Sequence, residues 1–203
     1  PVLLSSGKTT FIGWPRRIRR LVTSPGSKGF YFDASVGLRA RLSLFAFMRI
    51  PTILLRLGRE SSKKCSLTPL RSRDDLPLTW KKHLPGRRVD MGEVTLLHPE
   101  GRPLSMQDDC RPLLIVDSSW RHLPSVLAEV DGTLHRRALP ESLQTAYPRK
   151  SSLFEDPRNG LASVEALHAA ICLLGDRDDS LLVGYRWAEL WLESNRKILN
   201  LEL

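Results

Sequence analysis

A strand-like segment that ends in an acid and an aromatic residue holds the side chains best suited to chemistry. The hydrophobic run Leu113–Val116 is followed by Asp117, two serines and Trp120. Ligands of open α/β sheets bind just beyond the carboxyl ends of strands. A carboxylate and the face of an indole both attract cations, the indole by about 0.5–2 kcal/mol, so Asp117 and Trp120 suit a sulfonium cofactor. In the alternative interpretation, Asp117 caps the next turn and Trp120 belongs to the core.

A second segment, Lys63-Lys64-Cys65-Ser66, follows an earlier apolar run. Hydroxyl and backbone groups at a strand-to-helix junction can hold a ribose or a carboxylate, and lysines can meet phosphates. The alternative is a solvated basic turn with a buried Cys65. Near the start, Ser6-Gly7-Lys8-Thr9 resembles the end of a phosphate-binding loop, but Val2 stands where that loop needs glycine, so the match fails.

The three cysteines, Cys65, Cys110 and Cys172, are an odd number and widely spaced. This pattern favours neither a disulfide framework nor a zinc site, so no metal is expected, and a reducing, cytoplasmic setting is the default. The sequence has no apolar run of the roughly 20 residues that a membrane span needs. We therefore expect no membrane partner.

The charge of the chain is divided unevenly. It carries a net charge of +9, but residues 1–89 hold 19 Lys and Arg against 4 Asp and Glu, while residues 90–203 hold 12 against 18. A basic half of this kind favours a polyanionic partner such as nucleic acid. The candidate contacts to RNA are Lys63, Lys64, Lys81, Lys82, Arg87 and Arg88.

Three continuous apolar runs predict strands: Ile50–Leu57, Val94–Leu97 and Leu113–Val116. Continuous rather than alternating runs indicate a largely parallel sheet covered on both faces. Residues 48–135 are therefore expected to form an α/β half. Residues 1–47 show no sustained period and are expected to be a poorly ordered basic extension.

The remaining chain, residues 136–203, shows helical spacing and is expected to form a mainly helical half. Val164, Leu167, Ile171 and Leu174 predict one helix, with Ser163 capping its start and Gly175 ending it. A second helix is predicted from Ser180 to about Asn200, with Val183, Trp187, Leu190, Trp191 and Ile198 near one face.

Seven short motifs occur in order over some 150 residues: Lys64-Cys65-Ser66-x-x-x-Leu70, Leu97-His98-Pro99-Glu100-Gly101, Ser105-x-x-Asp108, Asp117-Ser118-Ser119-Trp120, Arg137-x-Leu139-Pro140, Leu161-x-Ser163-Val164-Glu165-Ala166-Leu167, and Trp187-x-x-x-Trp191-x-x-x-Asn195-x-x-x-Leu199. Together they resemble the small-subunit ribosomal RNA aminocarboxypropyltransferases. The resemblance implies a SPOUT-like knotted α/β domain joined to a helical domain, acting as a monomer in ribosome biogenesis.

By the same resemblance, the cofactor is S-adenosylmethionine, the partner is ribosomal RNA in a small-subunit precursor, and the target is a uridine-type base. Ser66, Leu97, Ala162, Ser163 and Glu165 are implied to surround the cofactor. Asp117 and Trp120 are implied to hold its methionine part and are the candidate catalytic residues. Asp117 either orients the cofactor or accepts the proton of the base.

The chain also departs from the family pattern. Leu67 stands where the family has glycine, Ser118 replaces a cysteine, and the stretch between Leu143 and Leu161 is altered. Three alternatives stay open: transfer of the same group to tRNA by a DTW-like enzyme, methylation of RNA, and RNA binding without turnover in ribosome assembly. The spacing of Asp117 and Trp120 is one residue longer than the Asp-x-Trp of the DTW family.

Overall fold

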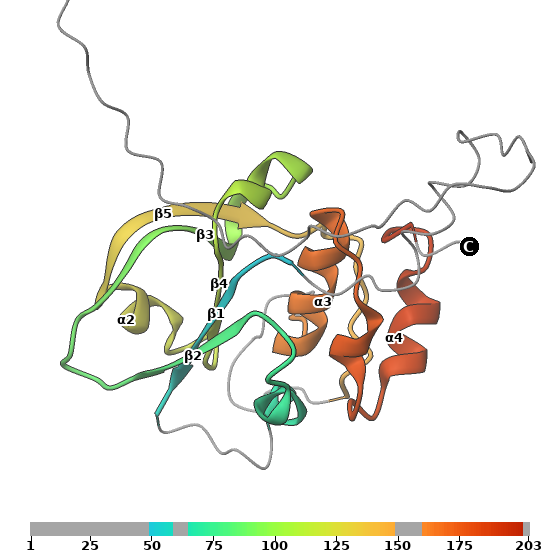
Figure 1. Cartoon of the computed structure of the whole chain (residues 1–203), viewed down its shortest axis with the longest axis horizontal. Helices are drawn as coiled ribbons and strands as arrows, with labels where there is room; N and C mark the ends of the chain where they lie inside the picture. The colour runs from blue at the N-terminus through green and yellow to red at the C-terminus, as the bar shows by residue number, and fades with distance from the viewer. Residues whose placement is uncertain (1–48, 59–64, 149–159, 201–203) are drawn as a thin grey trace, which may run out of the picture.

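The computed structural model describes residues 49–58, 65–148 and 160–200 (Figure 1). The whole of the expected basic extension, residues 1–47, therefore lies outside the described residues, as do Lys63, Lys64 and most of the altered stretch before Gly160. Within the described residues, no helix is both long and apolar enough to cross a membrane.

Five parallel strands form one sheet, in the order β2-β1-β4-β3-β5. Their bounds are β1 (Thr52–Leu57), β2 (Leu78–His83), β3 (Val89–Pro103), β4 (Leu113–Asp117) and β5 (Val130–Ala138). The three strands expected from the apolar runs are present, with Val94–Leu97 forming part of a longer strand. The predicted α/β class with a parallel sheet is confirmed.

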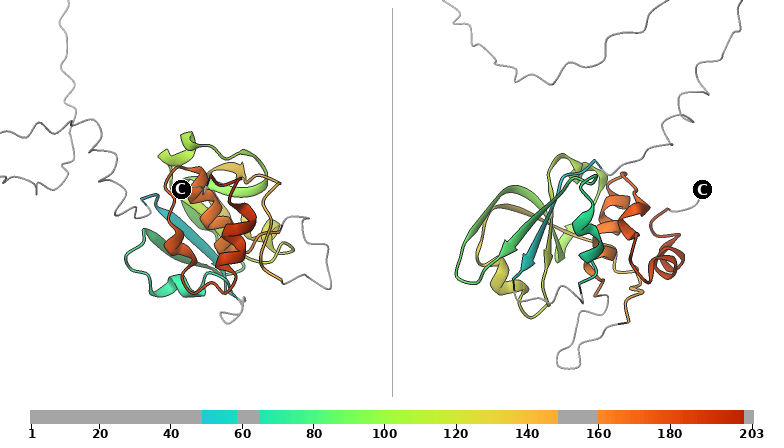
Figure 2. Two further views of the ribbon diagram at one scale, coloured as in Figure 1. Left: turned by 90° about the vertical axis from the view of Figure 1, so that its right-hand side faces the viewer. Right: turned by 60° about the horizontal axis from the view of Figure 1, so that its bottom comes forward.

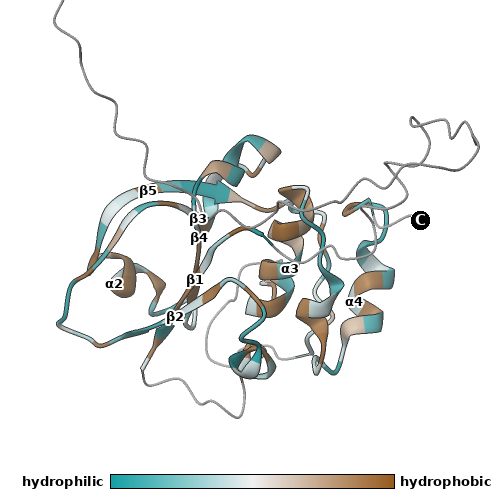
Figure 3. Cartoon of the chain, viewed as in Figure 1, coloured by the Kyte–Doolittle hydropathy of each residue, from teal (hydrophilic) through white to brown (hydrophobic). Residues whose placement is uncertain are grey.

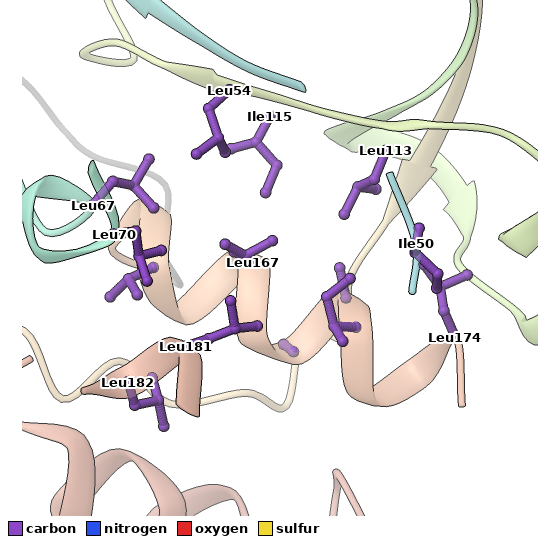
Figure 4. Packing of buried hydrophobic residues seen from close by; sticks show 14 of the residues in the cluster. Ile50, Leu54, Leu67, Leu70, Leu113, Ile115, Leu167, Leu174, Leu181 and Leu182 are labelled. Atoms are coloured by element: carbon purple, nitrogen blue, oxygen red, sulfur yellow. The ribbon is translucent and has the colours of Figure 1, made fainter. Parts of the chain in front are cut away.

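Alternate side chains of the central strands enter two separate hydrophobic clusters. In β4, Leu113 and Ile115 join one cluster and Leu114 the other. The first cluster packs against α3 (Ser163–Leu173), where Leu167 lies opposite Leu54 and Ile115 (Figure 4). The second packs against α2 (Leu123–Leu127) through Val126. Because both faces of the sheet are covered, β1 and β4 are largely apolar, as the hydropathy colouring of β4 shows (Figure 3).

The strands that the sequence did not predict, β2 and β5, are the two edges of the sheet. Their sequences, Leu78–His83 and Val130–Ala138, are rich in charged residues. Charged side chains on an edge strand oppose pairing with other chains. These charged residues also interrupt any continuous apolar run, which was the signal used to predict the inner strands. The two edge strands were missed for this reason.

Helix α3 starts and ends almost where its apolar spacing predicted, but its first residues are held differently. The residue before the helix is Ala162, with extended backbone, and the Ser163 hydroxyl donates to Asp117 instead of capping the helix. The expected cap at Ser163 is therefore wrong. Gly175 ends the helix as predicted: its φ is +82°, and the Asp176 amide donates to the Ile171 carbonyl at 3.0 Å.

The single helix expected from Ser180 to about Asn200 is wrong. The chain forms the short 3-10 helix η4 (Asp179–Leu182), turns at Gly184, and then forms α4 (Ala188–Asn195). Gly184 has φ +80°, which L side chains rarely adopt, and a Cβ there would lie 2.9 Å from Pro69. Helical spacing does not detect such a break, and Val183 and Leu190 of the expected face are exposed.

The boundary expected between residues 135 and 136 falls inside β5. Helix α3 and Trp191 of α4 share one hydrophobic cluster with β1 and β4. Figure 2 shows the C-terminal helices packed together on one side of the sheet. Two further 3-10 helices, η2 (Thr68–Ser72) and η3 (Met106–Cys110), follow β1 and β3.

A buried polar chain joins α3 to α4. The Trp191 indole N–H donates to Nδ1 of His168 at 3.1 Å, and Nε2 of His168 lies 3.0 Å from Asp179. An indole N–H can only donate, so Nδ1 accepts and Nε2 carries the proton. Burial lowers the pKa of His168, against the opposing effect of Asp179.

We expect this histidine to make stability depend on pH. The unfolded chain takes up a proton near pH 6.5 that the folded His168 resists, so the free energy of unfolding should fall as the pH drops below about 6.5. Between pH 7 and 5 the wild-type chain should lose about 1 kcal/mol more than His168→Asn. Urea unfolding at both pH values measures this, and parallel pH dependences would contradict it.

Candidate functional site

A cavity of about 570 Å³ opens where β3, β4 and β5 end, between α2 and the start of α3. This volume lies in the range of small-molecule sites. Most of its lining is apolar, and it comes from segments distant in sequence. The lining residues are Leu97, His98, Pro99, Ile115, Val116, Ser118, Trp120, Leu123, Leu139, Pro140, Glu141, Leu143, Leu161, Ser163 and Ala166.

An irregularity in β3 brings one wall to this cavity. Leu97 and Arg102 both pair with Arg137 of β5, so the four residues between them leave the strand ladder. Gly101 permits the return, because a Cβ at this position would lie 2.5 Å from backbone atoms of Arg137. The motif from Leu97 to Gly101 is thus a bulge that carries His98 and Pro99 to the cavity.

The Arg137 side chain fixes this region from the other side. Its Nε donates to Oδ1 of Asp108 at 2.8 Å, and Oδ2 of Asp108 accepts from the Ser105 backbone amide at 3.1 Å. Burial alone would raise the pKa of Asp108, but the hydrogen bonds from Arg137 and Ser105 outweigh burial and lower it. Two of the sequence motifs are therefore joined by one ion pair behind the cavity.

Asp117, at the end of β4, links three other segments. Its Oδ1 accepts from the Ser163 hydroxyl at 2.8 Å, and its Oδ2 lies 3.0 Å from the Cys65 thiol and 3.6 Å from Nε of Arg56. Arg56 is its register partner on β1, and both residues are buried. The carboxylate thus connects β1, β4, the Cys65 segment and the first turn of α3.

Cys65 serves as a hydrogen-bond donor here. Burial raises its thiol pKa to about 11, with a smaller contribution from the adjacent Asp117. A thiol with such a pKa has very little of the thiolate needed for nucleophilic attack. In the alternative interpretation, a solvated basic turn with a buried Cys65, the cysteine is half-buried and contacts Asp117, and the two lysines before it lie outside the described residues.

Ser66 and Glu165 hold the start of α3 in two further ways. The Ser66 hydroxyl accepts from the Val164 amide at 3.2 Å. Glu165 is completely buried and accepts from Ala146 N, Ala162 N, Thr145 Oγ1 and Tyr185 Oη, all within 2.6–2.8 Å. Neither Ser66 nor Glu165 is among the lining residues of the cavity. Their contact with a cofactor stays a prediction, as does that of Ala162.

The predicted residues Leu97, Trp120 and Ser163 do line the cavity. Trp120 is 37% exposed, so its interpretation as a core residue is wrong. Asp117 lies behind Ser163 and is not among the lining residues. The strand end singled out in the sequence therefore lies at the cavity. The indole of Trp120 is in the lining, and the carboxylate of Asp117 lies behind Ser163.

The four basic residues of the predicted RNA path that the structure describes lie elsewhere. Lys81 and Lys82 are on the edge strand β2, and Arg87 and Arg88 follow it. Lys81 Nζ donates to the Asp90 carbonyl at 3.2 Å, and Arg88 forms an ion pair with Asp131. None of the four lines the cavity.

The residues that the sequence reasoning missed at the site include Arg56, His98 and Glu141. Arg56 stood inside an apolar run, and a charged residue there was the signal, but only strand register places it beside Asp117. His98 was noted as part of a motif, without a role. The position of His98 at the cavity depends on the bulge in β3, and the spacing of residues in the sequence does not predict this bulge.

His168, Cys172 and Asp179 lie close enough together to be examined as metal ligands. However, the Trp191 N–H fixes the proton of His168 on Nε2, the atom nearest Asp179 and Cys172. Burial also raises the pKa of Cys172 to about 12. A metal needs a deprotonated nitrogen and a thiolate, so this cluster is organised as a hydrogen-bond network.

We expect Asp117→Asn to destabilise the fold, because it leaves the buried Arg56 guanidinium beside a neutral amide. Removing one partner of a buried ion pair costs about 3 kcal/mol. Asp131→Asn is the matched control, since its pair with Arg88 is exposed and should contribute little. Urea unfolding of both variants measures the difference in the free energy of unfolding. Equal losses would show that the buried pair of Asp117 and Arg56 stabilises the fold no more than the exposed pair of Asp131 and Arg88.

The chain is similar to known proteins in both sequence and fold. A scan against models of protein families gives no match. The chain is 32% identical over 144 residues to the 16S rRNA aminocarboxypropyltransferase of Halobacterium salinarum, covering 70% of this chain and 80% of the relative. Its fold is similar to that of the SAM-dependent rRNA:acp-transferase Tsr3 from Vulcanisaeta distributa, with a TM-score of 0.56 and 23% identity over 75% of this chain and 82% of the other. The length and identity of the first match show that the chain belongs to the rRNA aminocarboxypropyltransferase family.

Proposed function

We propose that the protein transfers the 3-amino-3-carboxypropyl group of S-adenosylmethionine to a uridine-type base in small-subunit ribosomal RNA. Membership of the aminocarboxypropyltransferase family supports the reaction. The observation that carries the proposal to this chain is the cavity at the strand ends, whose lining includes the exposed indole of Trp120 and the hydroxyl of Ser163.

The lining fits a sulfonium cofactor in size and character. Its apolar walls, with Leu97, Leu123 and Leu161 among them, suit the adenosine, and the indole face of Trp120 suits a positive sulfur. No lysine or arginine is among the lining residues that the structure describes. A sulfonium would therefore meet no direct cationic repulsion from this described part of the wall.

When bound, S-adenosylmethionine supplies an electrophilic carbon next to its sulfonium. The contribution of the protein is then mainly to position the cofactor, and holding two reactants in place can supply roughly 7–11 kcal/mol of the barrier. Trp120 and the backbone near Leu97 would hold the cofactor. Ser163, fixed by Asp117, would orient its polar end.

The order and direction of the five strands, and the similarity in fold to the Tsr3 structure, support the finer assignment to a SPOUT-like knotted domain. The succession α3, η4 and α4 supports a helical C-terminal domain. We extend the proposal to a monomer that acts in the cytoplasm on a precursor of the small subunit during ribosome biogenesis.

The basic surface of the first half remains the proposed RNA path. Lys82 and Arg87 are exposed and, with Lys81 and Arg88, lie along β2 and the turn after it. Lys63 and Lys64 belong to the path by sequence, because they directly precede Cys65, which contacts Asp117. Phosphate contacts from these residues would give an affinity that falls with salt.

The transferred group identifies the reaction directly. The purified chain should transfer label to small-subunit rRNA from S-adenosylmethionine labelled in its carboxyl group, and none from cofactor labelled in its methyl group. Transfer of the methyl label would identify a methyltransferase. Binding of RNA and cofactor without transfer of either label would favour an assembly factor, and label on tRNA alone would favour the DTW-like activity.

Trp120→Ala should weaken S-adenosylmethionine binding about tenfold, which corresponds to the ~1.4 kcal/mol expected from a lost aromatic contact with a cation. Calorimetry with the folded variant measures this. Trp80→Ala is the control, because Trp80 lies on β2 and is not among the cavity residues. If both variants keep the wild-type affinity, the indole of Trp120 does not contact the cofactor.

A further inference from the structure

Within the described part of the chain, two titratable side chains line the cavity, His98 and Glu141. His98 lies in the bulge of β3, directly after Leu97, which is implied to contact the adenosine. Asp117, expected either to orient the cofactor or to accept the proton of the base, is behind the wall, where its two oxygens contact Ser163, Cys65 and Arg56. A group that touches the base directly is therefore sought among the lining residues themselves.

The tautomer of His98 is fixed by its own bulge. The backbone amide of Glu100 donates to Nδ1 of His98 at 3.2 Å. A backbone amide can only donate, so Nδ1 accepts and the proton of the neutral ring is on Nε2. Gly101 maintains the turn that makes this bond possible, because no side chain fits against Arg137 there.

The surroundings keep His98 neutral. Burial lowers its pKa, nearby Arg136 lowers it further, and Glu100 opposes them with a smaller effect. A cationic sulfonium in the same cavity would act in the same direction as Arg136. His98 therefore presents one N–H donor, without a positive charge that would repel the cofactor.

We propose that His98 is a catalytic residue whose Nε2–H donates a hydrogen bond to a carbonyl oxygen of the target base while the neighbouring ring nitrogen loses its proton. The inference rests on the proposed function and identifies the group that prepares the nucleophile. A uridine-type base carries its reactive ring nitrogen beside carbonyl groups, so the negative charge left by the proton spreads onto oxygen. A fixed donor stabilises that charge where it develops.

The atoms and electrons of the step balance as follows. The N–H proton passes to solvent water, and the ring nitrogen forms a bond to the methylene carbon of the aminocarboxypropyl chain. The carbon–sulfur bond breaks with its electron pair on sulfur, which leaves neutral methylthioadenosine. His98 keeps its proton throughout. Glu141 does not suit the same role, since an ionised carboxylate beside the oxygen would repel the developing charge.

Two substitutions separate the two nitrogens of the ring. His98→Asn keeps an acceptor near the position of Nδ1 for the Glu100 amide and removes the donor at Nε2. His98→Gln places an amide donor near the position of Nε2. We expect His98→Asn to lower kcat about 100-fold and His98→Gln to stay within about tenfold of the wild-type chain, with S-adenosylmethionine affinity within twofold in both.

The measurements are single-turnover transfer of the carboxyl label to small-subunit rRNA, calorimetric binding of S-adenosylmethionine, and nitrogen NMR of the histidine ring in the full chain at pH 7. The NMR signal of His98 should be that of the Nε2–H tautomer. Equal loss of kcat in both variants, unchanged kcat in His98→Asn, or an Nδ1–H tautomer would overturn the inference. A tenfold loss of cofactor affinity in His98→Asn would instead assign His98 to the cofactor. If the wild-type chain transfers no carboxyl label, the proposed function fails and the role of His98 with it.

Discussion

The buried carboxylate of Asp117 is the point on which the geometry of the site depends. It stands at the end of the central strand β4 and accepts from Ser163 and Cys65, with Arg56 at 3.6 Å on the neighbouring strand. A buried carboxylate is costly unless charged and polar partners surround it, so each partner segment must come to it. The start of α3 and the Cys65 segment are thereby fixed relative to the sheet, and Ser163 at the start of α3 is held in its place in the cavity lining.

Further polar contacts extend this arrangement to the remaining walls. Glu165, in the first turn of α3, holds the residues after β5 by accepting from the Ala146 amide. Asn195 of α4 donates to the Gln144 backbone carbonyl at 2.9 Å and accepts from the Gln144 backbone amide at 2.8 Å. The segment from Leu139 to Leu143, which lines the cavity, has no regular secondary structure. Its position therefore comes from side chains of two helices. This explains why residues far from the cavity belong to the family motifs: they hold irregular backbone whose polar groups must otherwise find water.

The sequence predicted the elements whose signal is local and missed those that depend on tertiary context. Continuous apolar runs predicted β1 and β4, because strands buried on both faces are apolar on both faces. The helical spacing of apolar residues, followed by Gly175, predicted α3. The edge strands carry Lys81 and Arg136 instead and gave no signal. The helix expected after Ser180 is broken because Gly184 adopts a positive φ, which a helical spacing of side chains cannot reveal. At the site, the strand end was recognised, whereas the pairing of Arg56 with Asp117 required the register of two strands.

The distribution of charge around the cavity follows a single physical requirement. A sulfonium cofactor and a base that becomes anionic must meet, and each would be disturbed by a full charge of the wrong sign on the wall. Asp117 is kept one layer back, with Arg56 beside it, and contacts the cavity lining through the neutral hydroxyl of Ser163. His98 is held in its neutral form by burial and Arg136. Arg137 is paired with Asp108 behind the β3 bulge. Apart from the carboxyl group of Glu141, the described wall thus offers dipoles and an indole face, which can favour both partners.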